Sequence, residues 1–205
     1  MQNSHYFKSD PQLDHAIQLL DYELQGRSFA FKTDRGVFSR ERVDHGTDLM
    51  LKAVLADLSS LQEGTFPSKC LDLGCGYGVV SICLNSFWPE QIWQGFDVNP
   101  RALDLAKDNA NRSGLDIAYF LSDGIAETCG TFELILLNPP IRAGKEVCYR
   151  LFSEAAGHLS QEGYFYLVIQ NKQGARSAFK FLQSLFLDVE VIDKSSGYHT
   201  IRCRH

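Results

Sequence analysis

The chain has 205 residues, of which 44% are hydrophobic, and it carries a formal net charge of −5 at pH 7. A chain of this size and composition can bury one full hydrophobic core, so we expect one main domain with a small appendage. The negative charge excludes a general attraction to polyanions over the whole surface, so a nucleic-acid partner would require a local basic face.

The N-terminal part, residues 1–60, is predicted to form a small α+β appendage, and residues 61–205 to form the main domain. A short strand over 27–33 and a helix over 45–58 follow from the local pattern. The boundary follows this helix, where glycine, serine and proline gather. An earlier helix over 9–24 is predicted from two capping residues and from apolar residues at helical intervals: Ser9, Asp10, Leu13, Ile17 and Leu20.

Apolar runs alternate with helical patterns through the main domain. This alternation predicts an α/β fold with a Rossmann-like, mostly parallel sheet that is covered on both faces. We expect helices between the first six strands and an antiparallel C-terminal hairpin around KSSGY. Ligands bind such sheets beyond the carboxyl ends of the strands. The seven strands are expected near 69–73, 92–97, 117–121, 133–138, 163–170, 188–194 and 198–204.

The sequence also disfavours a membrane protein and a metal-binding module. No segment approaches the roughly 20 apolar residues of a membrane span, and no signal peptide is evident, so we expect a cytoplasmic protein without a membrane partner. The six cysteines include no C-x-x-C pair, and several fall in apolar runs. We therefore expect reduced thiols that pack as small hydrophobic side chains, and no metal site.

A glycine-rich loop, CLDLGCGYGVV, connects a predicted strand to a predicted helix. Glycine allows positive φ and lets a ligand approach the backbone closely. The pattern of Gly74, Gly76 and Gly78 is G-x-G-x-G, because Val79 stands where a dinucleotide-binding G-x-G-x-x-G fingerprint needs glycine. With Asp72 just ahead of it, the loop predicts a ligand site of another kind. The alternative is a tight turn that uses glycine for geometry alone.

Acidic residues end the next two predicted strands. Asp97 precedes Asn99 and Pro100, which already suit the start of a helix, so its carboxylate is available to accept both hydroxyls of a ribose. Asp123 stands before Gly124 and could accept from the exocyclic amine of an adenine. Asp-Gly is also an ordinary turn signal, which remains the alternative there.

LDLGCGYG, FDVNP and SDG together resemble the first three motifs of class I S-adenosylmethionine-dependent methyltransferases, whose seven-stranded sheet ends in such a hairpin. The resemblance implies that the glycine loop passes the methionine moiety, that Asp97 holds the ribose and that Asp123 contacts the adenine. The cofactor residues that it implies are Asp72, Gly74, Cys75, Gly76, Gly78, Asp97, Val98, Ser122, Asp123, Gly124 and Asn138.

The strand expected at 133–138 stops on Asn138, and Pro139 and Pro140 follow it. The lone pair of an exocyclic amine is delocalised into its ring, so methyl transfer to it needs acceptors that hold the amine's hydrogens. The side-chain oxygen of Asn138 and the carbonyl of Pro139 can supply two, while Pro140 ends the strand. These three residues are the predicted catalytic group. The alternative is that Asn-Pro merely terminates the strand.

In amino-methyltransferases, the related Asn-Pro-Pro motif is followed by an aromatic residue that stacks on the target base. Here the position holds Ile141, so stacking must come from elsewhere, with Phe38 or Tyr149 as candidates. Phe38 lies in DRGVFS, which the sequence allows to be either a lid over the ligand or an edge strand.

NPPIRAGKEV, HYFKSDP and FKTDRGVFSRERVDHGT further resemble the short single-domain members of the RsmC-like family, which methylate guanine N2 in 16S rRNA. The resemblance implies rRNA or the small ribosomal subunit as partner, met by the appendage or by the assembled particle. From their residue types and their places in the sequence, Phe38, Arg142 and Lys145 are the predicted substrate-binding residues. Methylation of a protein glutamine amide or of DNA adenine remains an alternative, as does a non-catalytic assembly factor. Two basic groups could face one phosphate surface or form a mixed-charge surface: Arg27, Lys32, Arg35, Arg40 and Arg42, and Arg142, Lys145 and Arg150.

Overall fold

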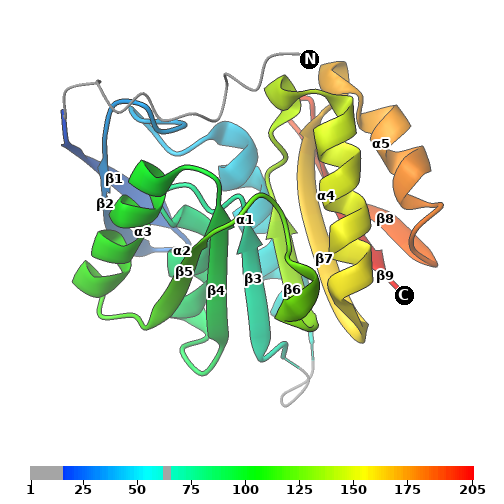
Figure 1. Ribbon diagram of the computed structural model, residues 1–205, viewed down its shortest axis with the longest axis horizontal. Helices are drawn as coiled ribbons and strands as arrows, with labels where there is room; N and C mark the ends of the chain where they lie inside the picture. Colours follow the sequence, from blue (N-terminus) through cyan, green and yellow to red (C-terminus); the bar gives the residue numbers. More distant parts are fainter. Residues whose placement is uncertain (1–15, 62–65) are drawn as a thin grey trace.

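The computed structural model describes residues 16–61 and 66–205. Within these ranges a two-stranded hairpin precedes a seven-stranded sheet (Figure 1). The strands are β1 (Gln18–Leu24), β2 (Arg27–Thr33), β3 (Lys69–Leu73), β4 (Ile92–Asp97), β5 (Ile117–Leu121), β6 (Phe132–Leu137), β7 (Leu159–Gln170), β8 (Asp188–Ser195) and β9 (Tyr198–Arg204). The α-helices are α1 (His45–Leu58), α2 (Val79–Phe87), α3 (Pro100–Arg112), α4 (Lys145–His158) and α5 (Ala175–Leu182).

The large sheet has the strand order β5-β4-β3-β6-β7-β9-β8. All its pairings are parallel except those of β9, which runs antiparallel to both β7 and β8. The predicted α/β class and the C-terminal hairpin are confirmed, and the strand positions agree closely with those expected. The exception is β7, which begins at Leu159 and not near residue 163.

Helices cover both faces of the sheet, so the molecule has three layers (Figure 1). The central strands are buried on both sides, and alternate residues of each strand enter different clusters. In β6, Leu134 and Leu136 join the cluster under α1, α2 and α3, whereas Ile135 and Leu137 join the cluster under α4 and α5. This core fixes the strand ends at which the site lies.

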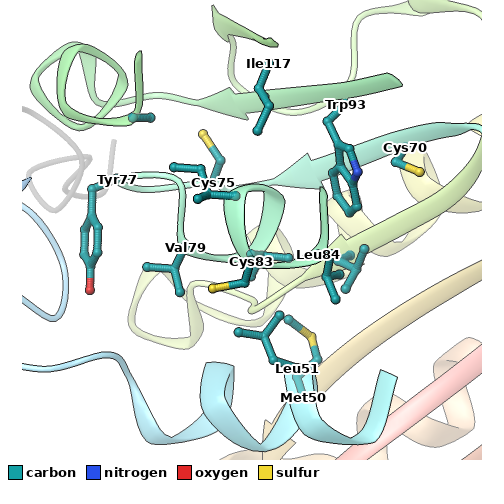
Figure 2. Packing of buried hydrophobic residues seen from close by; sticks show 14 of the residues in the cluster. Met50, Leu51, Cys70, Cys75, Tyr77, Val79, Cys83, Leu84, Trp93 and Ile117 are labelled. Carbon is teal, nitrogen blue, oxygen red and sulfur yellow. The ribbon is translucent and has the colours of Figure 1, made fainter. Parts of the chain in front are cut away.

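Helix α1 and the hairpin belong to the first of these clusters. Figure 2 shows Met50 and Leu51 of α1 directed toward Cys83 and Leu84 of α2, and all four side chains are buried. Side chains of the described residues 16–60 therefore contribute to the same core as the main domain. The sequence-based boundary at residue 60 stays a prediction.

The helix predicted over 9–24 is wrong where the structure describes it, since residues 18–24 form β1. Leu13 and its neighbours up to residue 15 lie outside the described residues. In β1 the buried Leu20 and Leu24 alternate with exposed neighbours, which is the period of a strand. Gln25 and Gly26 both have positive φ, as a type I′ hairpin turn requires, and pair β1 with β2. Pairing with β2 decides in favour of the strand.

The connection from β5 to β6 also differs from the expectation, because its described residues contain only a 3-10 turn at Glu127–Cys129 and no α-helix. The segment must pass from the edge of the sheet to β6, on the far side of β3 and β4. Gly124 and Gly130 adopt positive φ, and Ile125 is buried in the cluster under α4. The turns at Gly124 and Gly130 and the buried side chain of Ile125 allow the connection from β5 to β6 to cross the sheet without an α-helix.

The helices, cysteines and potential metal ligands of the described residues can be compared with the expectations from the sequence. None of the described helices is long and apolar enough to cross a membrane. All six cysteines are free, and five of them are buried. Burial raises the pKa of buried thiols such as Cys75 and Cys83, as expected for side chains that pack as small hydrophobes. No group of three or more metal-ligating side chains occurs among the described residues.

Candidate active site

A cleft of about 540 Å³ opens at the carboxyl ends of β3, β4 and β6. The glycine loop and the ends of these strands form one side of it. Residues 36–39 and the segment that enters α1 form the other side. The volume lies within the roughly 300–1,000 Å³ usual for small-molecule sites. Ligand binding at this edge is what a parallel sheet of this type favours.

The glycine loop turns tightly beneath the cleft. The N–H groups of Gly74 and Cys75 both donate to the carbonyl of Phe96, at 2.8 and 3.0 Å, which ties the end of β3 to β4. Gly74 and Gly76 have positive φ, and the space beside them is open, with one atom within 4 Å of a Cβ built on Gly74 and none for Gly76. A ligand can therefore approach the backbone here.

Gly78 differs from the other two glycines, because it is absent from the residues that line the cleft. It begins α2 with φ of +91°, and a Cβ there would stand 2.8 Å from the hydroxyl of Tyr119. The close approach of Tyr119 accounts for a glycine at this position, and the cofactor contact of Gly78 stays a prediction.

Asp97 lies in the cleft at the end of β4. Its two carboxylate oxygens accept hydrogen bonds from the N–H groups of Gly76 and Asn99, each at 2.8 Å. Asn99 caps α3 by accepting from the N–H of Arg101, as expected, and Val98 lies beside it in the cleft wall. Burial raises the pKa of Asp97, and the backbone hydrogen bonds oppose this rise. A carboxylate can accept about four hydrogen bonds, so Asp97 keeps acceptor capacity for a ligand.

Asp72 lines the base of the cleft and is 3% exposed. It accepts a hydrogen bond from the N–H of Ser81 at 3.0 Å. Burial raises the pKa of Asp72 to about 7, with hydrogen bonds from Ser81 acting in the opposite direction. A buried carboxylate at the base of an open cleft favours a positively charged ligand group nearby.

At the end of β5, Ser122, Asp123 and Gly124 all line the cleft. The Ser122 hydroxyl donates to the carbonyl of Gly124 at 2.7 Å. The Asp123 side chain is 77% exposed, and one of its oxygens forms a 2.5 Å ion pair with Arg150. Arg150 also pairs with Glu154, so the turn is fastened to α4. The adenine contact of Asp123 stays a prediction, and its other carboxylate oxygen is the atom that could make it.

Asn138 follows β6 and faces α1. Its side-chain Nδ2 donates to Oδ2 of Asp44 and to Oγ1 of Thr47, each at 2.9 Å. A carboxylate only accepts hydrogen bonds, so the amide nitrogen must face Asp44 and the amide oxygen must lie on the other side. Since Asn138 itself lines the cleft, its oxygen is the group available there.

The two prolines after Asn138 set the backbone. Pro140 has φ of −76° and ψ of 73°, and the N–H of Ile141 donates to the carbonyl of Pro139 at 2.8 Å. This is an inverse γ-turn, for which the proline ring fixes the required φ. The Pro139 carbonyl thus has one lone pair engaged and a second one for a ligand.

The loop of residues 34–43 covers one side of the cleft and contains no strand, so the edge-strand alternative for DRGVFS is wrong. The side chain of Asn99 donates to the carbonyl of Gly36 at 3.0 Å, and the hydroxyl of Tyr77 donates to the carbonyl of Ser39 at 3.2 Å. Phe38 lies between these two anchors, lines the cleft and is 61% exposed. The loop presents an aromatic ring at the cleft mouth.

The other predicted substrate residues are not all at the cleft. Arg142 lines it and is the only basic side chain that does so among the described residues. Neither Lys145 nor Tyr149 lines the cleft. The ammonium group of Lys145 lies 4.8 Å from the ring centroid of Tyr149. Tyr149 in turn stacks on Phe181 at 4.1 Å, away from the lining residues, which leaves Phe38 as the stacking candidate.

Three side chains of the two basic groups contact other parts of the protein. Lys32 pairs with Asp108 of α3 at 2.7 Å. Arg27 lies over the ring of Phe87 on α2. Arg150 pairs with Asp123 and Glu154. The ion pairs of Lys32 and Arg150 favour the mixed-charge alternative, and the single phosphate surface stays a prediction.

Sequence reasoning missed Asp44, Thr47 and Tyr198, which also line the cleft. Asp44 is the N-cap of α1 and accepts from the N–H of Thr47 at 3.1 Å. An aspartate ahead of a helical run is a readable cap signal, but its contact with Asn138 spans 94 positions and has no local signature.

A model of the methyltransferase small domain family matches residues 28–202. The chain is 36% identical to the uncharacterized protein YbxB of Bacillus subtilis over 98% of both chains. It is 31% identical to ribosomal RNA small subunit methyltransferase C of Shewanella loihica over 65% of this chain and 37% of that protein. Among solved structures it resembles the Thermus thermophilus 16S rRNA N2 G1207 methyltransferase RsmC, in complex with AdoMet and guanosine. That likeness has a TM-score of 0.82 at 24% identity and covers 96% of this chain and 53% of the other.

The cleft fits the cofactor of this family, S-adenosylmethionine, which supplies an electrophilic methyl group on a positively charged sulfonium when it is bound. The lining carboxylates of Asp72 and Asp97 suit a cationic ligand, and the open space beside Gly74 and Gly76 gives room for it. Asp97 has acceptor lone pairs for hydroxyl groups. The chain belongs to the methyltransferase small domain family and is an S-adenosylmethionine-dependent methyltransferase.

Proposed function

We propose that this enzyme methylates the exocyclic N2 amine of a guanine in 16S rRNA. The observation that carries the proposal is the amide of Asn138, whose nitrogen is engaged by Asp44 and Thr47 and whose oxygen is left for the cleft. An amide oxygen held there is an acceptor for an amine hydrogen. The similarity to small-subunit rRNA methyltransferases and to a structure that contains guanosine supports guanine in rRNA as the target.

In this proposal the backbone around Asn138 provides the second acceptor. The free lone pair of the Pro139 carbonyl and the Asn138 oxygen accept the two hydrogens of the amine, and the amine nitrogen is held with its lone pair directed toward the methyl donor. Pro140 fixes the turn that presents the Pro139 carbonyl. Catalysis here is positioning and electrostatic stabilisation, with no covalent bond to the protein.

The cofactor would occupy the side of the cleft built by β3, β4 and β5. Asp97 accepts the ribose hydroxyls, and the loop from Gly74 to Gly76, with Cys75 between them, passes the methionine moiety. Val98, Ser122, Asp123 and Gly124 surround the adenine in this proposal, and Asp72 lies at the base. Asn138 lies between cofactor and acceptor.

The substrate would enter beside the loop of residues 34–43. Phe38 is exposed at the mouth and can stack on the target base, replacing the aromatic residue that Ile141 does not supply. Arg142 can contact a neighbouring phosphate. A base within a duplex must be turned out to reach the cleft, at a cost of roughly a few kcal/mol, so an unpaired guanine is the favoured target.

The partner in this proposal is rRNA or the small ribosomal subunit, which places the enzyme in the cytoplasm. The chain spans 37% of the length of the Shewanella relative, so the activity and partners of that whole protein come to this chain only as part of the proposal.

The test follows label from tritiated S-adenosylmethionine into four acceptors: small ribosomal subunits, deproteinised 16S rRNA, DNA and bacterial protein extract. We expect label in the rRNA, recovered as N2-methylguanosine by nucleoside mass spectrometry. Loss of that nucleoside from cells that lack the protein would locate it in vivo. Label in protein or DNA alone would refute the proposal, and a protein that binds cofactor but labels none of the four would instead favour an assembly factor.

A further inference from the structure

The side chain of Asn138 is held by two residues that sequence motifs do not connect with it. Its Nδ2 has two hydrogens, and both are used: one by the Asp44 carboxylate and one by the Thr47 hydroxyl, at 2.9 Å each. Both partners come from the start of α1, which is 94 and 91 positions away in the chain. Both Nδ2 hydrogens of Asn138 are therefore engaged by residues at the start of α1.

This arrangement excludes a rotated amide. If Asn138 turned over, its oxygen would face the carboxylate of Asp44, two acceptors would meet, and the Thr47 hydroxyl alone could adapt. Hydrogen bonds from the nitrogen to a carboxylate also polarise the amide and make its oxygen a stronger acceptor. The same two contacts thus fix the direction of the oxygen and increase its negative charge.

The two partners are themselves rigid. The Asp44 oxygen that accepts from Asn138 also accepts from the N–H of Thr47, so it caps α1 at the same time. Gly46 lies between them, and a Cβ there would stand 3.0 Å from this oxygen and 3.1 Å from the ring of Tyr198. Thr47 is buried, and Met50, one turn further along α1, is anchored in the core. The helix start has little freedom to move away from Asn138.

We propose that Asp44 and Thr47 are positioning residues for methyl transfer, which orient and polarise the Asn138 amide so that its oxygen faces the acceptor amine. The inference rests on the proposed function, since it assigns these two residues to the amine-binding group of the same site. Neither residue needs to touch the amine. The start of α1 then supplies part of the catalytic geometry.

Thr47→Val is the sharpest test, because valine keeps the shape and the backbone N–H of threonine but removes the acceptor oxygen. We expect kcat to fall by about 10- to 100-fold, while KM for RNA and Kd for S-adenosylmethionine stay near wild type. Thr47→Ser restores the hydroxyl and should recover most of the rate. For Asp44, alanine should lower kcat, and Asp44→Asn should retain more activity, because asparagine also caps α1 and keeps an acceptor oxygen.

A measurement that does not depend on methyl transfer, the exchange of the Asn138 side-chain amide hydrogens with solvent, separates this inference from the proposed function. In protein labelled with ¹⁵N-asparagine, the side-chain amide signal of Asn138, identified by its loss in Asn138→Ala, should exchange slowly with solvent and exchange faster in Thr47→Val. If wild type labels no rRNA, the proposed function fails, while slow exchange would still support the anchored amide. Unchanged exchange, or Thr47→Val with wild-type kcat on a substrate that wild type methylates, would overturn the inference.

Discussion

Two halves of the cleft are built in different ways. The cofactor half, which consists of Asp72, Gly74, Gly76 and Asp97, is held by hydrogen bonds from backbone N–H groups near the strand ends, which donate to the Phe96 carbonyl and to the Asp72 and Asp97 carboxylates. The acceptor half, which consists of Phe38, Asp44, Thr47 and Asn138, is held by side-chain contacts between distant segments. The hydrogen-bond donors of the cofactor half are backbone N–H groups, which a single substitution does not remove, whereas the side-chain donors and acceptors of the other half can each be removed by one mutation. Cofactor binding and methyl transfer should therefore be separable.

Asn138→Ala should give the largest effect and tests this separation directly. Loss of the amide oxygen removes one of two acceptors for the amine, so kcat should fall by about 10²–10³-fold, as for loss of one oriented donor in other sites. Single-turnover kinetics measures the rate, and calorimetry with S-adenosylmethionine should give a Kd near that of wild type.

The matched control is Asn111→Ala, which removes an exposed asparagine from α3 and should leave the rate unchanged. If Asn138→Ala weakened cofactor binding as much as it slowed transfer, the two halves would not be separable. If its rate equalled that of wild type, the catalytic role of Asn138 would be refuted.

Asp72→Asn tests the cofactor half through stability. The pKa of Asp72 is raised to about 7 by burial, whereas an unfolded chain releases this proton near pH 3.9. As pH rises from about 4 to about 7, the unfolded state becomes ionised while the native state keeps its proton, so wild type loses free energy of unfolding in this window. Above pH 7 the neutral variant should be more stable by up to about 4 kcal/mol. Below pH 4 the two should match.

Urea denaturation of both proteins across this pH range measures the difference. Saturating S-adenosylmethionine should reduce it, because a cation in the cleft favours the ionised Asp72. A stability difference that is constant with pH would show that the variant acts through packing and not through the buried charge.

The sequence indicated most residues that line the cofactor half of the cleft but not the partners that hold Asn138, for a physical reason. Strand ends and the glycine loop are encoded by residues close together in the chain, and the parallel sheet then brings Asp72 and Asp97 to one edge. The partners of Asn138 come from α1, and no local pattern specifies a contact across 94 positions. Lys145 was assigned by its closeness in sequence to Asn138, yet its ammonium group lies over Tyr149.

The fold shows the same division. The large sheet follows from local periodicity, but β1 was predicted as helix because Ile17 and Leu20 also fit a helical interval. Its strand state depends on pairing with β2 through a turn at Gln25 and Gly26, which is not among the strong hairpin signals. Where the apolar spacing of a segment fits both a helix and a strand, pairing with a neighbouring strand determines which of the two forms.

Phe38→Ala should give the smallest of these effects. It should weaken the binding of RNA and leave the binding of S-adenosylmethionine unchanged. The ring is exposed at the cleft mouth and its loop is anchored by Tyr77 and Asn99, so its removal should leave the cofactor half intact. Base–aromatic stacking contributes roughly 1–3 kcal/mol, which predicts an increase of about 10-fold or more in KM for RNA with little change in kcat. Phe38→Trp should retain tight binding, and Leu187→Ala, at a highly exposed residue that does not line the cleft, should have no effect. If Phe38→Ala raised the Kd for S-adenosylmethionine instead, Phe38 would belong to the cofactor half, and the division between the cofactor half and the acceptor half would have to be redrawn around the loop of residues 34–43.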